Sequence, residues 1–169
     1  MRHYADLLRA TLSALLMLVV IAGTALAGPY EDSIAALEHG DYPTALRLLR
    51  PLADQGNASA QSVLGLMYAI GQGVRQNYAE AAKWLRKAAD QGDATAQASL
   101  GNMYEGGVGV PKDYIQAHKW FNLSLARAPP GEMHDLGVKL RDSVAAKMTP
   151  VQIAEAQKLA REWKPKSSQ

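Results

Sequence analysis

The sequence predicts an all-α fold, a superhelical solenoid built from antiparallel helix pairs. The first observation is a repeat, because residues 54–84 recur almost residue for residue as residues 90–120, a shift of 36 positions. The second is the apolar spacing within each period, which follows two helical stripes separated by a glycine-containing stretch. Residues that recur in such a fold are most simply explained by packing between neighbouring units. A specific activity must then depend on residues that do not recur.

Residues 1–27 are expected to be a secretory signal peptide. Arg2 and Arg9 give a weakly positive start, an apolar run follows, and Ala25 and Ala27 place small residues where a signal peptidase cleaves. The uncharged stretch within this segment lies at the lower length limit of a spanning helix, so an uncleaved membrane anchor is the alternative. We expect an exported protein, periplasmic or secreted, with no stable membrane span after signal cleavage.

The remaining residues, 28–169, are enough for one domain of ordinary size and carry a net charge of +1. That near balance gives no basic footprint for nucleic acid. Cysteine is absent, which excludes disulfides and a thiol nucleophile. His39, His118 and His134 lack metal-ligand spacing, and His118 is expected on a surface turn. We predict no metal, no cofactor and no catalytic residue, although a triad assembled only in space stays open.

A partial unit is predicted at residues 32–54. Tyr42, Ala45 and Leu49 stand 36 positions before matching residues of the next unit, so they should belong to a helix of the second type. The short segment 33–39 should be its partner. A first unit with an irregular partner helix is typical of a capped solenoid.

Each complete repeat, residues 57–91 and 93–127, is predicted to contain two helices joined by a glycine loop. Asn57 can cap the first helix, and Asn77, with Glu80 at capping-box spacing, can cap the second. Aspartates take both cap positions in the second repeat. Strong caps at matching places therefore support the same two helix starts in both repeats.

Fourteen recurring positions are expected to be structural. They are Leu64, Gly65, Tyr68, Gly71, Gly73, Tyr78 and Trp84, with Leu100, Gly101, Tyr104, Gly107, Gly109, Tyr114 and Trp120. The glycine inside each first helix should let another helix approach closely, and the loop glycines should adopt a positive φ. Tyr78 should begin the buried stripe of the second helix. Packing explains the aromatic residues better than a surface that stacks sugars or peptides.

Two capping helices are predicted within residues 132–163, after the repeat register is lost. Thr149, Pro150 and Gln152 supply an N-cap, a proline at the first helical position and a capping-box partner. We expect this helix pair to cover the exposed end of the stack. A flexible tail should follow at residues 164–169.

The pattern AxAQxxLGxMY, followed by GxGV, AxKW and AxxG, resembles the Sel1-like repeat family. It runs through residues 58–92 and again through 94–120, and the resemblance covers about residues 41–127. Residues 148–163 are similar to the closing segment of many bacterial members. The resemblance implies a solenoid related to tetratricopeptide repeats that serves as an adaptor for other proteins. Some exported members with paired cysteines have been associated with penicillin binding, which is not carried over to this cysteine-free chain.

Positions that differ between the two first helices form the candidate partner-binding groove. They lie on one helix face and are Ser62, Leu66 and Ala69, with Ala98, Asn102 and Glu105. The resemblance implies that first helices line a concave groove, so these six residues could bind a protein or peptide segment. A solvated face that is free to vary is the alternative.

The sequence as a whole favours a non-catalytic scaffold in the bacterial envelope. A peptidoglycan-related enzyme or a wall-binding accessory protein is the alternative.

Overall fold

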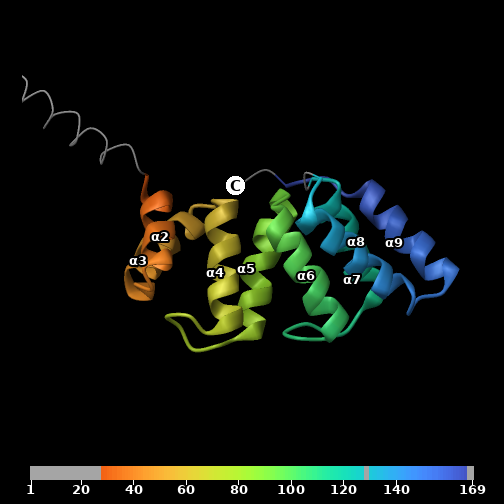
Figure 1. The fold of residues 1–169 in the computed structure, drawn as a ribbon, viewed down its shortest axis with the longest axis horizontal. Helices are drawn as coiled ribbons and strands as arrows, with labels where there is room; N and C mark the ends of the chain where they lie inside the picture. Colours follow the sequence, from red (N-terminus) through yellow and green to blue (C-terminus); the bar gives the residue numbers. More distant parts are fainter. Residues whose placement is uncertain (1–27, 128–129, 167–169) are drawn as a thin grey trace, which may run out of the picture.

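The computed structural model describes residues 28–127 and 130–166, which form eight α-helices and, within those ranges, no strand. The helices follow one another in a curved row, as Figure 1 shows. They are α2 (Pro29–Glu38), α3 (Tyr42–Asp54), α4 (Ala58–Ile70), α5 (Tyr78–Gln91), α6 (Ala94–Gly106), α7 (Tyr114–Leu125), α8 (Glu132–Ala145) and α9 (Pro150–Glu162). The expected signal peptide lies outside the described residues.

Three helix pairs form the body of the fold, and the predicted all-α solenoid is confirmed. The pairs α2–α3, α4–α5 and α6–α7 each make extensive internal contact, and each pair also packs against the next (Figure 1). Helix α2 begins at Pro29, four residues before the segment expected from the sequence, because proline is well suited to a first helical position.

Side-chain caps start the repeat helices at the expected places. The Asn57 Oδ1 accepts a hydrogen bond from the Ala60 N–H at 2.9 Å, and the Asn77 Oδ1 accepts one from the Glu80 N–H at 3.1 Å. Glu80 does not complete a capping box, because its carboxylate pairs with Lys83 at 3.0 Å. The box at the start of α9 has both of its reciprocal hydrogen bonds.

Close helix contact explains the glycine inside each first helix. A Cβ atom on Gly65 would lie 2.7 Å from the Leu85 Cγ, and one on Gly101 would lie 2.7 Å from the Phe121 Cε1. Ordinary contacts between carbon atoms are about 3.5–4.0 Å, so neither position has room for a side chain. The expected close approach of the second helix is confirmed in both repeats.

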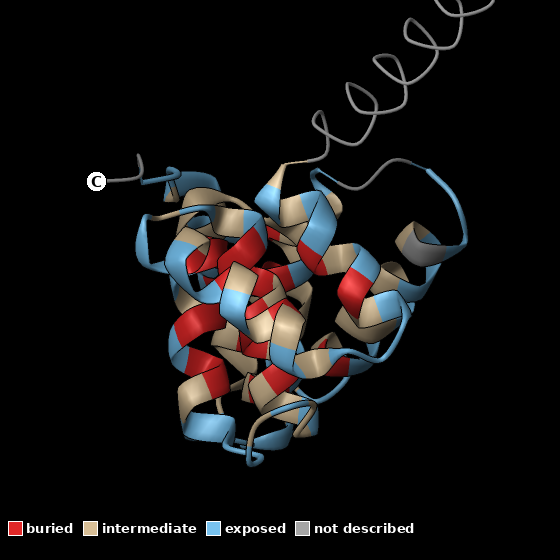
Figure 2. Ribbon diagram, turned by 90° about the vertical axis from the view of Figure 1, so that its left-hand side faces the viewer, coloured by how far each residue is buried: buried red, intermediate tan, exposed pale blue. Residues whose placement is uncertain are grey.

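The core lies between the helix layers, and Figure 2 shows the buried stretches of the helices gathered in the interior of the stack. Leu64 and Leu100 are fully buried, and the recurring Trp84 and Trp120 are also buried. The prediction for Tyr78 is wrong, since its side chain is 42% exposed. Tyr78 is the first residue of α5, and its hydroxyl accepts a hydrogen bond from Gln76 at 2.9 Å.

The tyrosine that ends each first helix lies at the edge of the core. Arg50 donates to the Tyr68 hydroxyl at 3.3 Å, and Arg86 donates to the Tyr104 hydroxyl. Both arginines belong to the second helix of the preceding unit and stand 36 positions apart. The polar ends of these tyrosines are therefore satisfied by a contact between successive units.

The two C-terminal helices cover α7 at the exposed end of the stack, as expected from the sequence, but they do not pack mainly against each other. Each packs against α7 and contacts different residues of it. Val144 of α8 packs with Phe121, whereas α9 adjoins Leu123 and extends Trp163 to the core of the second repeat. The irregular spacing after α7 gave no repeat register from which this split arrangement could be deduced.

Two further expectations at this end need correction. His118 is buried rather than on a surface turn, because α8 covers this part of α7, and its Nδ1 lies 2.9 Å from the Asn122 amide. Burial lowers the pKa of His118. The start of the tail is also held in place, since the Lys166 N–H donates to the Asp90 carbonyl at 2.8 Å. The expected tail beyond Lys166 lies outside the described residues.

Candidate partner-binding surface

The predicted groove residues of the first repeat do not form an open surface. Ser62 is only 3% exposed, and Leu66 and Ala69 pack against the core of the second repeat. The face of α4 that carries them turns towards α6, because first helices of successive repeats contact each other. Variation at these positions therefore reflects packing between two non-identical units.

The equivalent residues of the second repeat are partly covered by the capping region. Ala98 is half-buried, and the Glu105 carboxylate pairs with the Lys147 ammonium at 2.7 Å. The hydrogen bond to Glu105 raises the pKa of Lys147. Lys147 follows α8, so the capping region reaches the place that a further repeat would cover. Among the six predicted residues, Asn102 alone is largely exposed.

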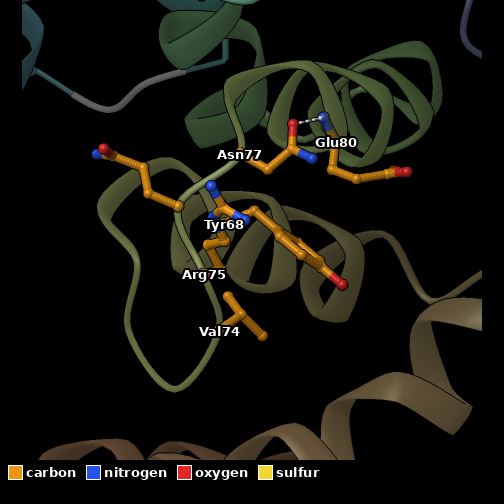
Figure 3. Close-up of a pocket in the computed structure, with 6 residues that line it drawn as sticks. Tyr68, Val74, Arg75, Asn77 and Glu80 are labelled. Atoms are coloured by element: carbon orange, nitrogen blue, oxygen red, sulfur yellow. Dashed lines mark hydrogen bonds between the residues drawn. The ribbon is translucent and has the colours of Figure 1, made fainter.

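A cavity opens elsewhere in the first repeat, at the loop that joins α4 to α5 (Figure 3). Its volume is about 630 Å³. The residues that line it are Tyr68, Val74, Arg75, Gln76, Asn77 and Glu80. They come from the last turn of α4, the loop itself and the first turn of α5. The cavity therefore lies where the two helices of one repeat are joined.

Most polar groups of this cavity are held by neighbouring groups. Gln76 donates to the Ala69 carbonyl at 2.8 Å, Asn77 caps α5, and Glu80 pairs with Lys83. Arg75 differs, because its guanidinium makes no hydrogen bond or ion pair with any residue that the structure describes. The cavity thus combines a fixed frame with one exposed cation whose donors are available to a ligand.

The lining separates into residues that recur and residues that do not. Tyr68 and Val74 recur in the second repeat, where they form part of its packing. Asn77 is replaced by Asp113, which keeps the capping role, and Arg75, Gln76 and Glu80 are replaced by the dissimilar Pro111, Lys112 and Gln116. The predicted groove depended on positions that differ between the first helices, whereas the unique residues of this cavity lie in the loop and at the start of the second helix. Comparison of the two loops would have supplied the signal.

Two exposed apolar side chains flank this loop along the chain. Ile70 is 60% exposed at the end of α4, and Tyr78 is exposed at the start of α5. Exposed aliphatic and aromatic groups beside an arginine are typical of protein interaction surfaces. We define the Tyr68 cavity together with Ile70 and Tyr78 as the loop surface of the first repeat.

Across residues 28–127 and 130–166, no three metal-ligating side chains come together. Within the same ranges, every helix is too short or too polar to cross a bilayer.

The sequence matches the Sel1 repeat family over three consecutive segments, residues 25–57, 58–93 and 94–127. The chain belongs to the Sel1 repeat family. Repeats of this family typically mediate protein binding, and its members generally serve as non-enzymatic interaction scaffolds. The matched segments correspond to the three helix pairs that precede α8.

Two solved structures resemble this Sel1 repeat protein. One is a protective antigen present in uropathogenic Escherichia coli strains that displays an SLR fold, with 32% identity and a TM-score of 0.65. The alignment covers 86% of this chain but only 28% of the antigen. The other is a Sel1 repeat protein from Oxalobacter formigenes, with 32% identity, a TM-score of 0.58, and coverage of 76% of this chain and 98% of that one. No curated protein sequence matched the chain.

Proposed function

We propose that this Sel1 repeat protein is an exported, non-catalytic scaffold that binds a segment of a partner protein at the loop surface of the first repeat. The observation that carries the proposal is the open cavity lined by Arg75, Gln76 and Glu80, which do not recur. Most recurring residues, with the exposed Tyr78 as an exception, are occupied in packing successive units, so partner selection falls to the residues that differ.

The composition of this surface indicates how a segment would bind. Ile70 and Tyr78 offer apolar area, and the Arg75 guanidinium offers donors to carbonyl or carboxylate groups of the partner. Arginine and tyrosine are enriched among the residues that contribute most of the energy of protein interfaces. An extended segment with an aliphatic anchor and an oxygen acceptor matches this arrangement.

Export is part of the proposal and is supported by the charge and apolar pattern of residues 1–27. Mass spectrometry of the protein purified from its native host tests it. A mature chain that begins at Gly28 supports export with cleavage, whereas an intact N-terminus would contradict cleavage and favour the membrane-anchored alternative.

Site-specific photo-crosslinking tests the binding surface. A photoreactive residue at Ile70 should yield one discrete crosslinked partner in cells. The matched control is Val151, an equally apolar residue that is 76% exposed on α9 and should yield none. Equal labelling from both positions, or no partner at Ile70, would contradict the proposed surface.

A charge reversal identifies the role of the loop. Arg75→Glu should abolish formation of the crosslink, because it places a carboxylate where the partner needs a donor. The matched control is Lys112→Glu, which makes the same charge change in the equivalent loop of the second repeat and should leave the crosslink intact.

Incubation with purified cell-wall fragments tests the enzymatic alternative. Turnover of these fragments that follows the protein through purification would refute a non-catalytic role.

A further inference from the structure

A second surface lies where α5 of the first repeat meets α7 of the second repeat, and its charge differs from that of the equivalent surface between α3 and α5. It is formed by Arg86 and Asp90 of α5, Lys119 of α7, and Lys166 of the tail. The equivalent residues one period earlier are Arg50, Asp54 and Lys83. The same framework is therefore present twice, and the tail adds a residue to one copy only.

Arg86 is held in a fixed orientation by aromatic rings. Its guanidinium carbon lies 5.4 Å from the centroid of Tyr104 and 5.3 Å from that of Trp120, and it donates to the Tyr104 hydroxyl. Its Nε is buried without a hydrogen-bond partner in the described structure. Such a cation has lost part of its hydration without gaining an acidic partner.

Lys119 stands close to the same aromatic ring and to other cations. Its ammonium lies 4.1 Å from the centroid of Trp120. Burial lowers the pKa of Lys119, and the charges of Arg86 and Lys166 lower it further, against the opposing effect of Asp90. Within the described residues, no carboxylate lies within ion-pair distance of Lys119, because Asp90 is paired with Lys166 at 2.7 Å.

In the first repeat, the lysine equivalent to Lys119 has an acidic partner. Lys83 pairs with Glu80 at 3.0 Å, and its side chain is 68% exposed. In the second repeat the position of Glu80 is taken by Gln116, so the equivalent acid is missing. The tail then brings in Lys166. Because Gln116 replaces the acid and Lys166 is added, this cluster has three cations, Arg86, Lys119 and Lys166, and one carboxylate, Asp90.

We propose that Arg86, Lys119 and Lys166 form a site that binds a carboxylate side chain from an acidic segment of a partner protein. Packing does not explain why the acid is absent from the second repeat, because the first repeat packs in the same way with Glu80 present. A bound carboxylate supplies the counter-charge that Gln116 does not, and charge-assisted hydrogen bonds to arginine and lysine are strong. A compact group of three cations is too small a footprint for a nucleic acid backbone.

This site goes beyond the proposed function and shares no residue with the loop surface of the first repeat. The test is titration of the intact mature protein with a fluorescently labelled hexaglutamate peptide, blocked at both ends, at low ionic strength. Saturable binding that weakens as salt is added is the expected result. An absence of saturable binding would overturn the proposal.

Gln116→Glu is the most informative variant, because it introduces the intrahelical acid that the first repeat already has. It should weaken hexaglutamate binding by about tenfold or more. Lys119→Met, which keeps the packing of the stem on Trp120, should do the same, while the matched Lys83→Met should change the affinity less than about twofold. Equal effects of Lys119→Met and Lys83→Met, or undiminished binding by Gln116→Glu, would overturn the proposal.

Two further titrations test the class of ligand and whether this site is separate from the loop surface. A single-stranded oligonucleotide of equal charge should bind more weakly than hexaglutamate, and tighter binding would overturn the carboxylate assignment. Arg75→Glu should leave hexaglutamate affinity unchanged while abolishing the crosslink at Ile70. Loss of hexaglutamate binding in Arg75→Glu would overturn the separate site.

Discussion

Replacement of Gly101 by alanine tests whether the recurring glycine is required for helix packing. The new Cβ atom would lie 2.7, 2.8 and 2.9 Å from three ring carbons of Phe121. The ring cannot swing outwards, because Phe121 is buried and packs with Ala117 and Val144. Helices α6 and α7 must separate, or the ring must adopt a strained rotamer.

The expected loss of stability follows from two opposing contributions. Alanine is favoured over glycine inside a helix by about 1 kcal/mol. Overpacking of a filled core costs about 1–3 kcal/mol, and three contacts below 3.0 Å place this site at the upper end of that range. We expect Gly101→Ala to lower the free energy of unfolding by about 2 kcal/mol.

Urea denaturation of the mature protein, followed by circular dichroism, measures this loss. The matched control is Gly106→Ala in the same helix, where the nearest atom to the new Cβ would be a Val108 methyl at 3.3 Å. This control should be neutral or stabilising by up to about 1 kcal/mol. A Gly101→Ala protein as stable as the Gly106→Ala protein would refute the close-packing explanation.

Two more stability predictions follow from burial. Trp84→Ala should cost about 3–5 kcal/mol, whereas Tyr78→Ala should cost less than about 1 kcal/mol, because only the tryptophan is buried; urea midpoints of the two variants compare them. His118 has a folded-state pKa below its ordinary value of 6.5, mainly through burial, with Arg141 lowering it further and Asp142 opposing. The unfolded chain therefore binds a proton first, so stability should fall as pH drops below that value. His118→Gln should show a smaller fall between neutral and mildly acidic urea titrations, and an unchanged fall would contradict this origin.

The helical repeat was predictable because local chemistry and the 36-residue period agree. Asn57 and Asn77 mark helix starts through hydrogen bonds within one turn, which depend little on the rest of the fold. Gly65 and Gly101 could be explained from the sequence because glycine inside a helix is costly unless a close contact requires it. The agreement of these features in two units made the fold class predictable.

The binding surface was less predictable because it depends on how the units are rotated relative to one another. Helical spacing placed Ser62 and Leu66 on one face of α4, but it did not show that α6 would cover that face. The split of α8 and α9 across α7 hid His118 for the same reason. The cavity around Arg75 required the path of the loop between two helices, which has no periodic pattern.

Oxidative footprinting of the wild-type protein in its non-covalent complex with the partner tests the central claim most directly. The partner is the protein that crosslinking from position 70 identifies. The claim is that residues unique to one repeat select the partner, while recurring residues hold the helices together. Ile70, which is replaced by Gly106 in the second repeat, should lose reactivity in the complex, and Val108 in the equivalent loop of the second repeat should keep it. Protection of Val108 with continued reactivity of Ile70 would contradict the account.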